Sequence, residues 1–530
     1  MSLLQQTGDV FKAYFLPALL VLVVLHFAIN RYGYGLGKIP GPFVASLTDF
    51  WRMFHAYTNK GHQDYLLHRK YNSPVLRVGP KTVAVASPDA VRVIYGWKPV
   101  YRKTQIYTTQ SQLNSNGQLV ENLASTMDEE KHTRLAKPVA AAYGMSTLVE
   151  FEPLVDSTSR TFVEQMEQRF ARPTKECPLD RWLQMYAFDV IGELTFSKRI
   201  GFLETGQDVD QMMYHTGRFM EYTGVVGQVP NLDWYFRIKN PILHMLRPTS
   251  NILGFTLKQI REHQKSSHSP SDSHSGPRDF LTRFLEAREK YPDIVDEGLV
   301  HDYANTNVAG GSDTTAIILR TLVHQFVTQR SILDKVLGEI GAALRARQAP
   351  GDADPDPDPD ADADMDRPIT WAEGLKMTYY QACIKEALRF HPATAQILPR
   401  LVPAGGVELG GHYLPPGTVV GCNAWSVHRD PVLYGQDVDR YRPERWLEVS
   451  PDQARKMETS LLTFGAGKRA CVGKNIAMLE ITKFIPEFFR RFDVELVDPE
   501  RWKITSTWLA VQSGLDVRLK VRPLESLLAE

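Results

Sequence analysis

Residues 464–473 read FGAGKRACVG, and this glycine-rich stretch contains a single cysteine, Cys471. Gly465 and Gly467 permit a tight turn in which the backbone approaches a flat partner closely. Gly473 precedes an apolar run with helical spacing, so the N–H groups at the start of that helix would point at the sulfur. Such donors favour a thiolate, which is a ligand for iron. The competing interpretation is a buried free thiol that packs like a small apolar side chain.

The spacing F-G-x-G-x-R-x-C-x-G resembles the haem-binding loop of the cytochrome P450 superfamily, and every defined position of that pattern is met. The matching residues are Phe464, Gly465, Gly467, Arg469, Cys471 and Gly473. The resemblance implies that Cys471 is the proximal ligand of the iron of haem b, and that Phe464 packs beneath it. It also implies that Arg469 pairs with a haem propionate, while Gly467 and Gly473 belong to the cofactor-binding loop.

Composition limits the class of protein. The chain has 530 residues, 43% of them hydrophobic, and can bury a large core as one big domain or two. Lys and Arg together number 61, as do Asp and Glu, so no net charge favours nucleic acid and such binding is not expected. The four cysteines form no CxxC pair, which suits neither a zinc site nor a disulfide framework. A reducing compartment is therefore expected for the main body.

An apolar run near the N-terminus, residues 11–29, is close to the roughly 20 residues that cross a bilayer. It predicts one transmembrane helix within an anchor at residues 1–30, followed by a Pro/Gly linker at residues 31–45. A cleaved signal peptide is the alternative, but the basic start and small-residue cleavage site are missing. Arg31 and Lys38 after the run favour a cytosolic position for the rest of the chain.

The remainder, residues 46–530, predicts a mainly α domain with smaller β regions. Alternating apolar residues predict two short strands within residues 74–86 and further strands within residues 407–420. Helical periodicity covers residues 128–143, 154–170, 179–194 and 211–222. An Asp-rich insertion at about residues 348–367 repels itself and is expected to be disordered on the surface.

A long apolar helix is predicted over residues 298–329, and its centre, residues 309–315, reads AGGSDTT. Two adjacent glycines cost roughly 2 kcal/mol relative to alanine, so a buried helix needs a reason for them. Close approach of a ligand is one reason, and tight helix packing, which does not explain Asp313 and Thr314, is another. The segment resembles the oxygen-binding groove of the same superfamily. By that resemblance, Thr314 hydrogen-bonds bound oxygen and Asp313 relays protons from solvent.

A third pattern involves charged residues. Residues 379–389 predict a helix on which Glu386 and Arg389 share one face, and alone this is an ordinary helix ion pair. The sequence YRPERW that follows at residues 441–446 supplies Arg445 in a pattern similar to the partner loop of the superfamily. The resemblance implies a buried carboxylate between two guanidiniums that holds the cysteine loop in place.

Further contacts to the haem are less clearly patterned. Arg400 is a second candidate partner for a propionate. Many superfamily members carry a Trp and, four residues later, an Arg in a helix that contacts the propionates. Here His132 and Ala136 occupy the corresponding positions, so His132 is a candidate contact, with Arg134 or Lys137 as possible substitutes.

Together these patterns resemble a microsomal haem-thiolate monooxygenase with a long central helix over the haem and a small N-terminal β-rich region. Such an enzyme inserts one oxygen atom from O2 into a lipophilic small molecule by hydroxylation, epoxidation or oxidative demethylation. The chain has no room for a flavin domain, so NADPH-cytochrome P450 reductase is the implied partner, docking near Lys468, Arg469 and Lys474 at the endoplasmic reticulum membrane.

The pattern around residues 131–148 and the Asp-rich insertion are similar to filamentous-fungal members, such as the pisatin demethylase group, that tailor secondary metabolites. Two other functions are compatible with a haem-thiolate protein. One is an isomerase or dehydratase that needs no O2, and the other is a non-enzymatic haem sensor or carrier.

Overall fold

The computed structural model describes residues 14–113, 119–236, 252–266, 278–348 and 365–528. Most of the Asp-rich insertion, the start of the predicted anchor and several polar connections lie outside these residues. The longer helices are α8 (Glu152–Met166), α9 (Leu179–Phe196), α11 (Met212–Val226), α14 (Ile252–Ser266), α15 (Phe280–Lys290), α16 (Glu297–Gly311), α17 (Asp313–Thr328), α18 (Arg330–Arg347), α21 (Thr378–Phe390) and α25 (Lys474–Arg491). Others used below are α2 (Leu16–Tyr32), α3 (Phe50–Tyr57), α4 (Asp64–Tyr71), α5 (Pro88–Ile94), α6 (Glu129–Ala136) and α12 (Pro230–Trp234).

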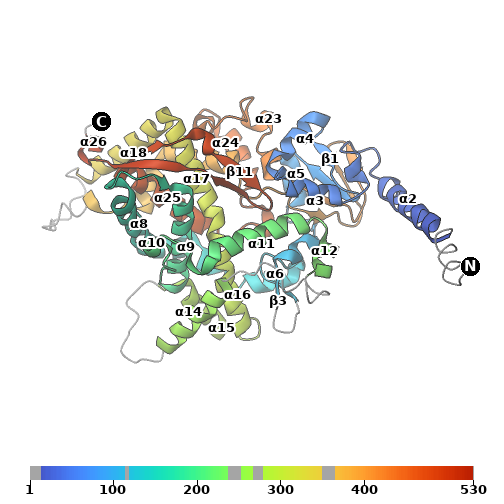
Figure 1. Ribbon diagram of the computed structural model, residues 1–530, viewed down its shortest axis with the longest axis horizontal. Helices are drawn as coiled ribbons and strands as arrows, with labels where there is room; N and C mark the ends of the chain where they lie inside the picture. Colours follow the sequence, from blue (N-terminus) through green and yellow to red (C-terminus); the bar gives the residue numbers. More distant parts are fainter. Residues whose placement is uncertain (1–13, 114–118, 237–251, 267–277, 349–364, 529–530) are drawn as a thin grey trace, which may run out of the picture.

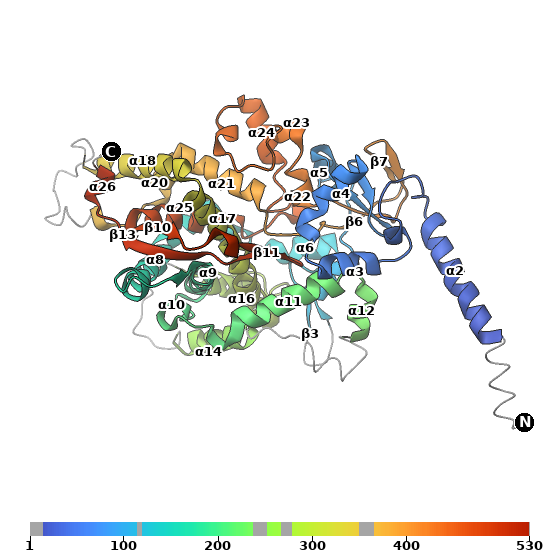
Figure 2. The ribbon, with the colours of Figure 1, turned by 45° about the horizontal axis from the view of Figure 1, so that its top comes forward.

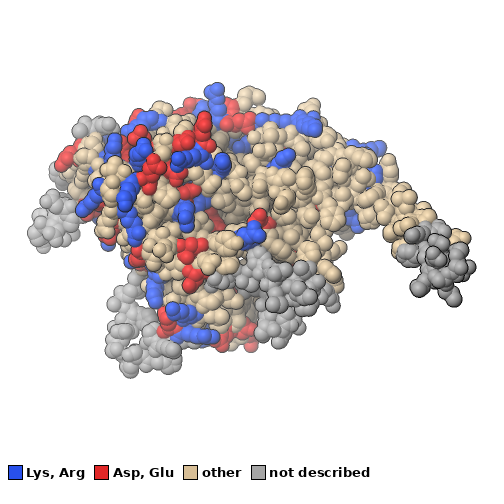
Figure 3. Space-filling view, viewed as in Figure 1, with Lys and Arg blue, Asp and Glu red and all other residues tan. Residues whose placement is uncertain are grey.

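Helices form the larger part of the molecule, as the periodicity predicted. Figure 1 shows a helical body on one side, a smaller region of strands with α3, α4 and α5 on the other, and α2 projecting from the latter. Charges of both signs are interspersed over one face of the helical body, in keeping with the balanced composition (Figure 3).

The core of the helical body is organised around α9. Every residue of this helix except Arg181 and Gln184 is buried, and it packs against α8, α16 and α17. A helix that is buried on all sides belongs to the interior of a large core. Tyr186 of α9 stacks on Phe484 of α25 with ring centroids 4.0 Å apart. This contact links α9 to the helix that follows the cysteine.

The principal sheet has the strand order β1 (Val75–Arg77), β2 (Thr82–Val85), β9 (Val419–Gly421) and β6 (Arg400–Leu401). β1 and β2 are antiparallel, β2 and β9 parallel, and β6 and β9 antiparallel. The predicted short strands are thus confirmed. Beyond the named strands, an isolated antiparallel bridge pairs Lys103 with Arg400 and brings two cations to one place.

Smaller sheets complete the β regions. They contain β10 (Phe492–Leu496), β13 (Asp516–Val521) and β5 (Cys177–Pro178), then β11 (Lys503–Ser506) with β12 (Ala510–Ser513), β7 (Val407–Leu409) with β8 (His412–Leu414), and β3 (Gln112–Leu113) with β4 (Leu119–Val120).

The N-terminal helix differs from the predicted transmembrane span. Among the residues described, no helix combines the length and the apolar character required to cross a membrane. α2 begins at Leu16, whereas the predicted span begins at residue 11, which lies outside the described part of the chain. The C-terminal end of α2 is fixed to β1 because Arg77 donates to the carbonyl oxygens of Asn30 (2.5 Å) and Arg31 (2.9 Å). Figure 2 shows the rest of α2 projecting from the body.

Candidate active site

A cavity of about 490 Å³ lies where the cysteine loop, the junction of α16 with α17, and α6 come together. Its wall contains most of the site residues predicted from the sequence. These are His132, Thr314, Arg400, Phe464, Arg469, Cys471 and Gly473. Asp313 and Gly467 do not line it, and neither do Glu386, Arg389 and Arg445.

The loop that carries Cys471 needs glycine at two positions. Gly465 and Gly467 have φ of +66° and +63°, a region that other residues adopt only with strain. A Cβ on Gly467 would also lie 1.9 Å from the carbonyl oxygen of Tyr95. The turn closes where the Cys471 N–H donates to the Phe464 carbonyl oxygen at 2.7 Å. The predicted tight turn is confirmed, and it presents the cysteine to the cavity.

The state of the Cys471 sulfur differs from the prediction that helix-end donors alone would yield a thiolate. Enclosure by the surrounding protein raises the pKa of the thiol, while the N–H groups of Gly473 and Lys474 lower it to a smaller extent. The donors therefore only offset part of the burial effect. Because a coordinating thiol loses its proton to a bound metal ion, the site favours a thiolate only when a metal is present.

The break in the long central helix separates α16 from α17 at Ser312. Glycine occurs at the two positions before the break for different structural reasons. A Cβ on Gly311 would lie 2.9 Å from Ile191 Cγ1 of α9, so this glycine permits tight helix packing. A Cβ on Gly310 would meet no atom within 4 Å, since this glycine faces the cavity. The packing explanation is thus confirmed for Gly311, while close approach of a ligand stays a prediction for Gly310, which has open space beside it.

Thr314 and Asp313 point in different directions from this break. Thr314 lines the cavity, and its Oγ1 donates to the Gly310 carbonyl oxygen at 2.7 Å. Asp313 is buried on the side of α9, where its Oδ1 accepts a hydrogen bond of 2.5 Å from Gln184. Gln184 in turn accepts one of 2.9 Å from Arg320. Burial raises the pKa of Asp313, and the Gln184 hydrogen bond and Arg320 oppose that rise.

Three buried cations approach the cavity: Lys103, Arg400 and Arg469, called the pocket cations below. Arg400 donates to the Tyr107 hydroxyl at 2.8 Å. Arg469 forms an ion pair of 3.0 Å with Glu129 of α6, yet its Nη1 is buried without a hydrogen-bond partner among the described residues. An unpaired buried N–H on a guanidinium is costly, and it indicates an acceptor that a ligand supplies.

Residues of α6 contribute less to the cavity than the resemblance implied. His132 lines it and is half-buried, and burial, Arg469 and Lys103 lower its pKa to about 4, so it is neutral at pH 7. Arg134 and Lys137 are exposed and do not line the cavity. The side chain of Arg469 is only 5% exposed, so of the three basic residues expected on a docking surface Lys468 and Lys474 are the ones whose side chains are accessible.

Glu386, Arg389 and Arg445 form a fully buried cluster, the buried triad, with side chains that are at most 1% exposed. The Glu386 carboxylate accepts from Arg389 (2.7 and 2.8 Å) and from Arg445 (3.0 Å). It also accepts from the Trp446 indole (3.0 Å) and the Arg442 N–H (2.9 Å). The remaining donors of both arginines are satisfied by backbone carbonyls and by Asp437.

His428 joins the buried triad to the cysteine loop, a connection that the sequence did not reveal. Its Nδ1 donates to the Arg389 carbonyl oxygen at 3.0 Å, and its Nε2 accepts from the Leu462 N–H at 2.8 Å. Burial and the nearby Arg389 lower the pKa of His428 to about 3, which keeps the neutral ring these two bonds require. Thr463 adds a second tie, donating to the Leu388 carbonyl oxygen at 2.6 Å.

The residues around the 490 Å³ cavity fit a haem. Cys471 presents a sulfur to the cavity that could serve as a ligand, and Gly310, also in its wall, leaves space for a bound group. The described residues contain no group of three or more His, Cys, Asp or Glu suited to a metal ion. No carboxylate is among the described residues that line this cavity, whereas the pocket cations and the orphan Arg469 Nη1 match the carboxylates of a haem.

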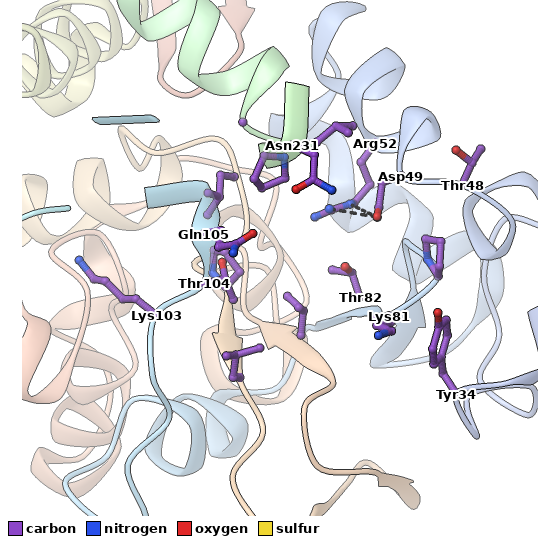
Figure 4. A pocket seen from close by; sticks show the side chains of 18 of the residues that line it. Tyr34, Thr48, Asp49, Arg52, Lys81, Thr82, Lys103, Thr104, Gln105 and Asn231 are labelled. Atoms are coloured by element: carbon purple, nitrogen blue, oxygen red, sulfur yellow. Dashed lines mark hydrogen bonds and ion pairs between the residues drawn. The ribbon is translucent and has the colours of Figure 1, made fainter. Parts of the chain in front are cut away.

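A second cavity of about 880 Å³ lies beyond residues 102–106, between α3, α12 and the principal sheet (Figure 4). Arg52 on its wall forms an ion pair with Asp49 at 3.1 Å and donates to the Gln228 carbonyl oxygen at 2.8 Å. Lys103 borders both cavities, so the segment that carries it is the wall between them.

Comparison with known proteins identifies the family of the chain. The family described as Cytochrome P450 matches residues 37–519. The cytochrome P450 monooxygenase cicH of Emericella nidulans is 37% identical over 507 residues, covering 95% of this chain and 97% of that protein. A cytochrome P450 monooxygenase of Aspergillus terreus is 40% identical, covering 87% of this chain and 90% of that protein.

A third relative, the cytochrome P450 monooxygenase mfmA of Annulohypoxylon moriforme, is 34% identical and covers 96% of both chains. The family match over residues 37–519 spans the cysteine loop, α16 and α17, and the buried triad. The chain therefore belongs to the cytochrome P450 family and is a monooxygenase of that family.

Proposed function

We propose that the enzyme inserts one oxygen atom from O2 into a lipophilic small molecule, with Cys471 as the thiolate ligand of a haem b. The observation that carries this proposal is the placement of Cys471 and Thr314 on the wall of one cavity. A thiolate-ligated haem supplies the oxidising chemistry when bound. The described lining also contains apolar side chains such as Ile318 and Leu398, which suit a lipophilic substrate.

Residues of the chain would supply protons to the cavity. The Thr314 hydroxyl, which donates to the Gly310 carbonyl oxygen, can turn to a ligand in the cavity. Asp313 lies one residue earlier, and burial raises the pKa of its carboxyl, which shifts it towards the protonated form. We assign Thr314 the role of hydrogen-bond donor and Asp313 that of proton reservoir, with Gln184 and Arg320 as its positioning residues.

Electrons would come from NADPH through a separate reductase. Lys468 and Lys474, both exposed beside the cysteine loop, suit an acidic partner surface. α2 presents apolar side chains to solvent along its length, and the part of the molecule next to it carries few acidic residues on the face in Figure 3. Attachment to the endoplasmic reticulum membrane through this segment is part of the proposal, as is a role in fungal secondary metabolism.

The direct test supplies isotopically labelled O2, NADPH and a fungal reductase together with compounds that displace a water-like sixth ligand in a spectral screen. We expect a product that is heavier by one labelled oxygen atom. Product formation without O2 and NADPH would indicate the isomerase or dehydratase instead. Spectral binding with no product under any condition would indicate a sensor or carrier.

Thr314→Ala tests the proton assignment. Loss of the hydroxyl should lower product formation by roughly 100-fold, a typical contribution of a proton donor, while NADPH consumption continues. Thr328→Ala is the matched control, because Thr328 lies at the end of the same helix and its hydroxyl bonds only to backbone carbonyls there. Equal product yield per NADPH in both variants would refute the assignment of Thr314.

A further inference from the structure

We propose that Lys103 is a haem-binding residue whose ammonium group pairs with a haem propionate. The inference relies on the haem of the family and not on the identity of the substrate or the reaction. Lys103 comes from a polar segment with no recognisable motif, and α6 offers the cavity no cation of its own, since Ala136 lines it while Arg134 and Lys137 are exposed.

Backbone contacts hold Lys103 beside the other pocket cations. It forms the antiparallel bridge with Arg400, and the next residue, Leu401, donates its N–H to the Arg102 carbonyl oxygen at 2.8 Å. The Lys103 ammonium lies 4.3 Å from the centroid of the Tyr107 ring, the same tyrosine whose hydroxyl accepts from Arg400. Figure 4 shows the Lys103 side chain extending away from Asp49, Arg52 and Lys81 of the second cavity.

The charges of this region do not balance within the described residues. Lys103 and Arg400 are 8% and 5% exposed, and the Arg469 side chain is 5% exposed. Glu129 is the carboxylate that pairs with Arg469, so with Lys103 in its charged form three positive charges face one negative charge and leave an excess of two. A haem carries two propionates, which equal that excess. Lys468 also borders the cavity, but it is exposed and water screens its charge.

Lys103 itself has capacity for a further acceptor. Its Nζ donates to the Ala124 carbonyl oxygen at 2.5 Å, while an ammonium has three N–H donors. Burial, and then Arg400 and Arg469, lower the pKa of Lys103 well below its usual value. A buried cation among like charges is unfavourable in the haem-free protein, and a carboxylate ligand would relieve this.

A purely structural lysine would behave differently. If Lys103 only tied its segment to Ala124, its loss would destabilise the protein whether or not haem is present. If it binds a propionate, its loss removes repulsion from the haem-free protein and an attraction from the haem-bound protein. The two roles therefore predict opposite changes in the stability of the haem-free protein.

The experiment compares Lys103→Met with the wild type by the rate at which haem transfers to excess apomyoglobin. We expect transfer to become about tenfold faster or more, the size of one hydrogen bond to a charged group. Lys131→Met is the control for loss of a positive charge near the site, because Lys131 pairs with Glu121 and its side chain is 40% exposed. Its transfer rate should equal that of the wild type.

Two further measurements complete the test. The haem-free Lys103→Met protein should unfold at the same temperature as the haem-free wild type or at a higher one. Reconstitution with the dimethyl ester of haem, which lacks the propionate charges, should make the transfer rates of Lys103→Met and the wild type equal. A lower unfolding temperature, or an unchanged difference with the ester, would overturn the proposal.

Discussion

The buried triad and the pocket cations are two groups of buried charges, and they differ in how fully their hydrogen bonds and charges are paired. In the buried triad, one carboxylate accepts from both arginines, and the other arginine donors find backbone carbonyls or Asp437. Among the pocket cations, Arg469 keeps a buried donor without a partner, and positive charge is in excess.

This difference separates structural from ligand-binding charges. A buried ion pair whose hydrogen bonds are all made contributes little net stability. Removal of one partner is strongly destabilising, because it leaves an unpaired charge in the interior. A buried donor without a hydrogen-bond partner is unfavourable, and a ligand that supplies the acceptor removes this cost. The buried triad should therefore affect stability first, and the pocket cations should affect haem binding first.

Loss of the triad carboxylate should give the largest effect. Glu386→Gln leaves Arg389 and Arg445 without a counter-charge in the interior, so the free energy of unfolding should fall by about 3–5 kcal/mol. Chemical unfolding of the haem-free protein measures this free energy. The control, Glu458→Gln, removes the partner of Lys385, an exposed residue next to Glu386 on α21, and should change the free energy of unfolding by about 1 kcal/mol or less. Equal effects of the two variants would mean that the buried triad is not a structural centre.

Removing the partner of Arg469 should have an intermediate effect of a different kind. Glu129→Gln weakens the contact that holds Arg469 in the haem-free protein, so that form should lose about 1–2 kcal/mol. Haem affinity should stay the same or increase, because Arg469 becomes free to bind a propionate. Haem titration and unfolding of the same variant measure both quantities, and a loss of haem affinity equal to the loss of stability would contradict the distinction between the two clusters.

The smallest effect concerns pH. The folded protein lowers the pKa of His132 from 6.5 to about 4, so protonation favours the unfolded state. Its contribution to stability is therefore complete above pH 6.5 and decreases as the pH falls from 6.5 towards 4. With a discount for partial exposure, His132→Gln should reduce the stability difference between pH 7 and pH 5 by about 1 kcal/mol or less.

Haem propionates would offset the positive charges that lower this pKa, so the pH effect should be smaller in the haem-bound protein. Thermal unfolding at both pH values, with and without haem, provides the comparison. An acid sensitivity that is identical in wild type and His132→Gln would show that His132 does not face the pocket cations.

Patterns within one short segment could be predicted from the sequence. The glycine turns at Gly465 and Gly467, the disturbance of the central helix and the Glu386–Arg389 pair depend on local spacing and backbone preference. The principal strands and most helices follow from periodicity in the same way. The helix break itself, at Ser312, is where the composition is least suited to a helix.

Contacts between distant segments were beyond such patterns. Lys103 meets Arg400 because a loop crosses the edge of the principal sheet, and Asp313 turns to Gln184 because the helix restarts after Ser312. The pKa of Cys471 depends on how many elements enclose the sulfur, which the local motif does not contain. The prediction of a long transmembrane helix relied on residues of which the first few lie outside the described part of the chain.

The central claim is that Cys471 is the thiolate ligand of a haem in the 490 Å³ cavity. The most direct measurement is the absorption spectrum of the reduced, carbon monoxide-bound protein for the wild type, Cys471→Ser and Cys177→Ala, the last being a buried cysteine that does not line the cavity. We expect the strongly red-shifted Soret band of thiolate ligation in the wild type and in Cys177→Ala, and its absence in a folded Cys471→Ser protein. A Cys471→Ser protein that keeps this band would contradict the account.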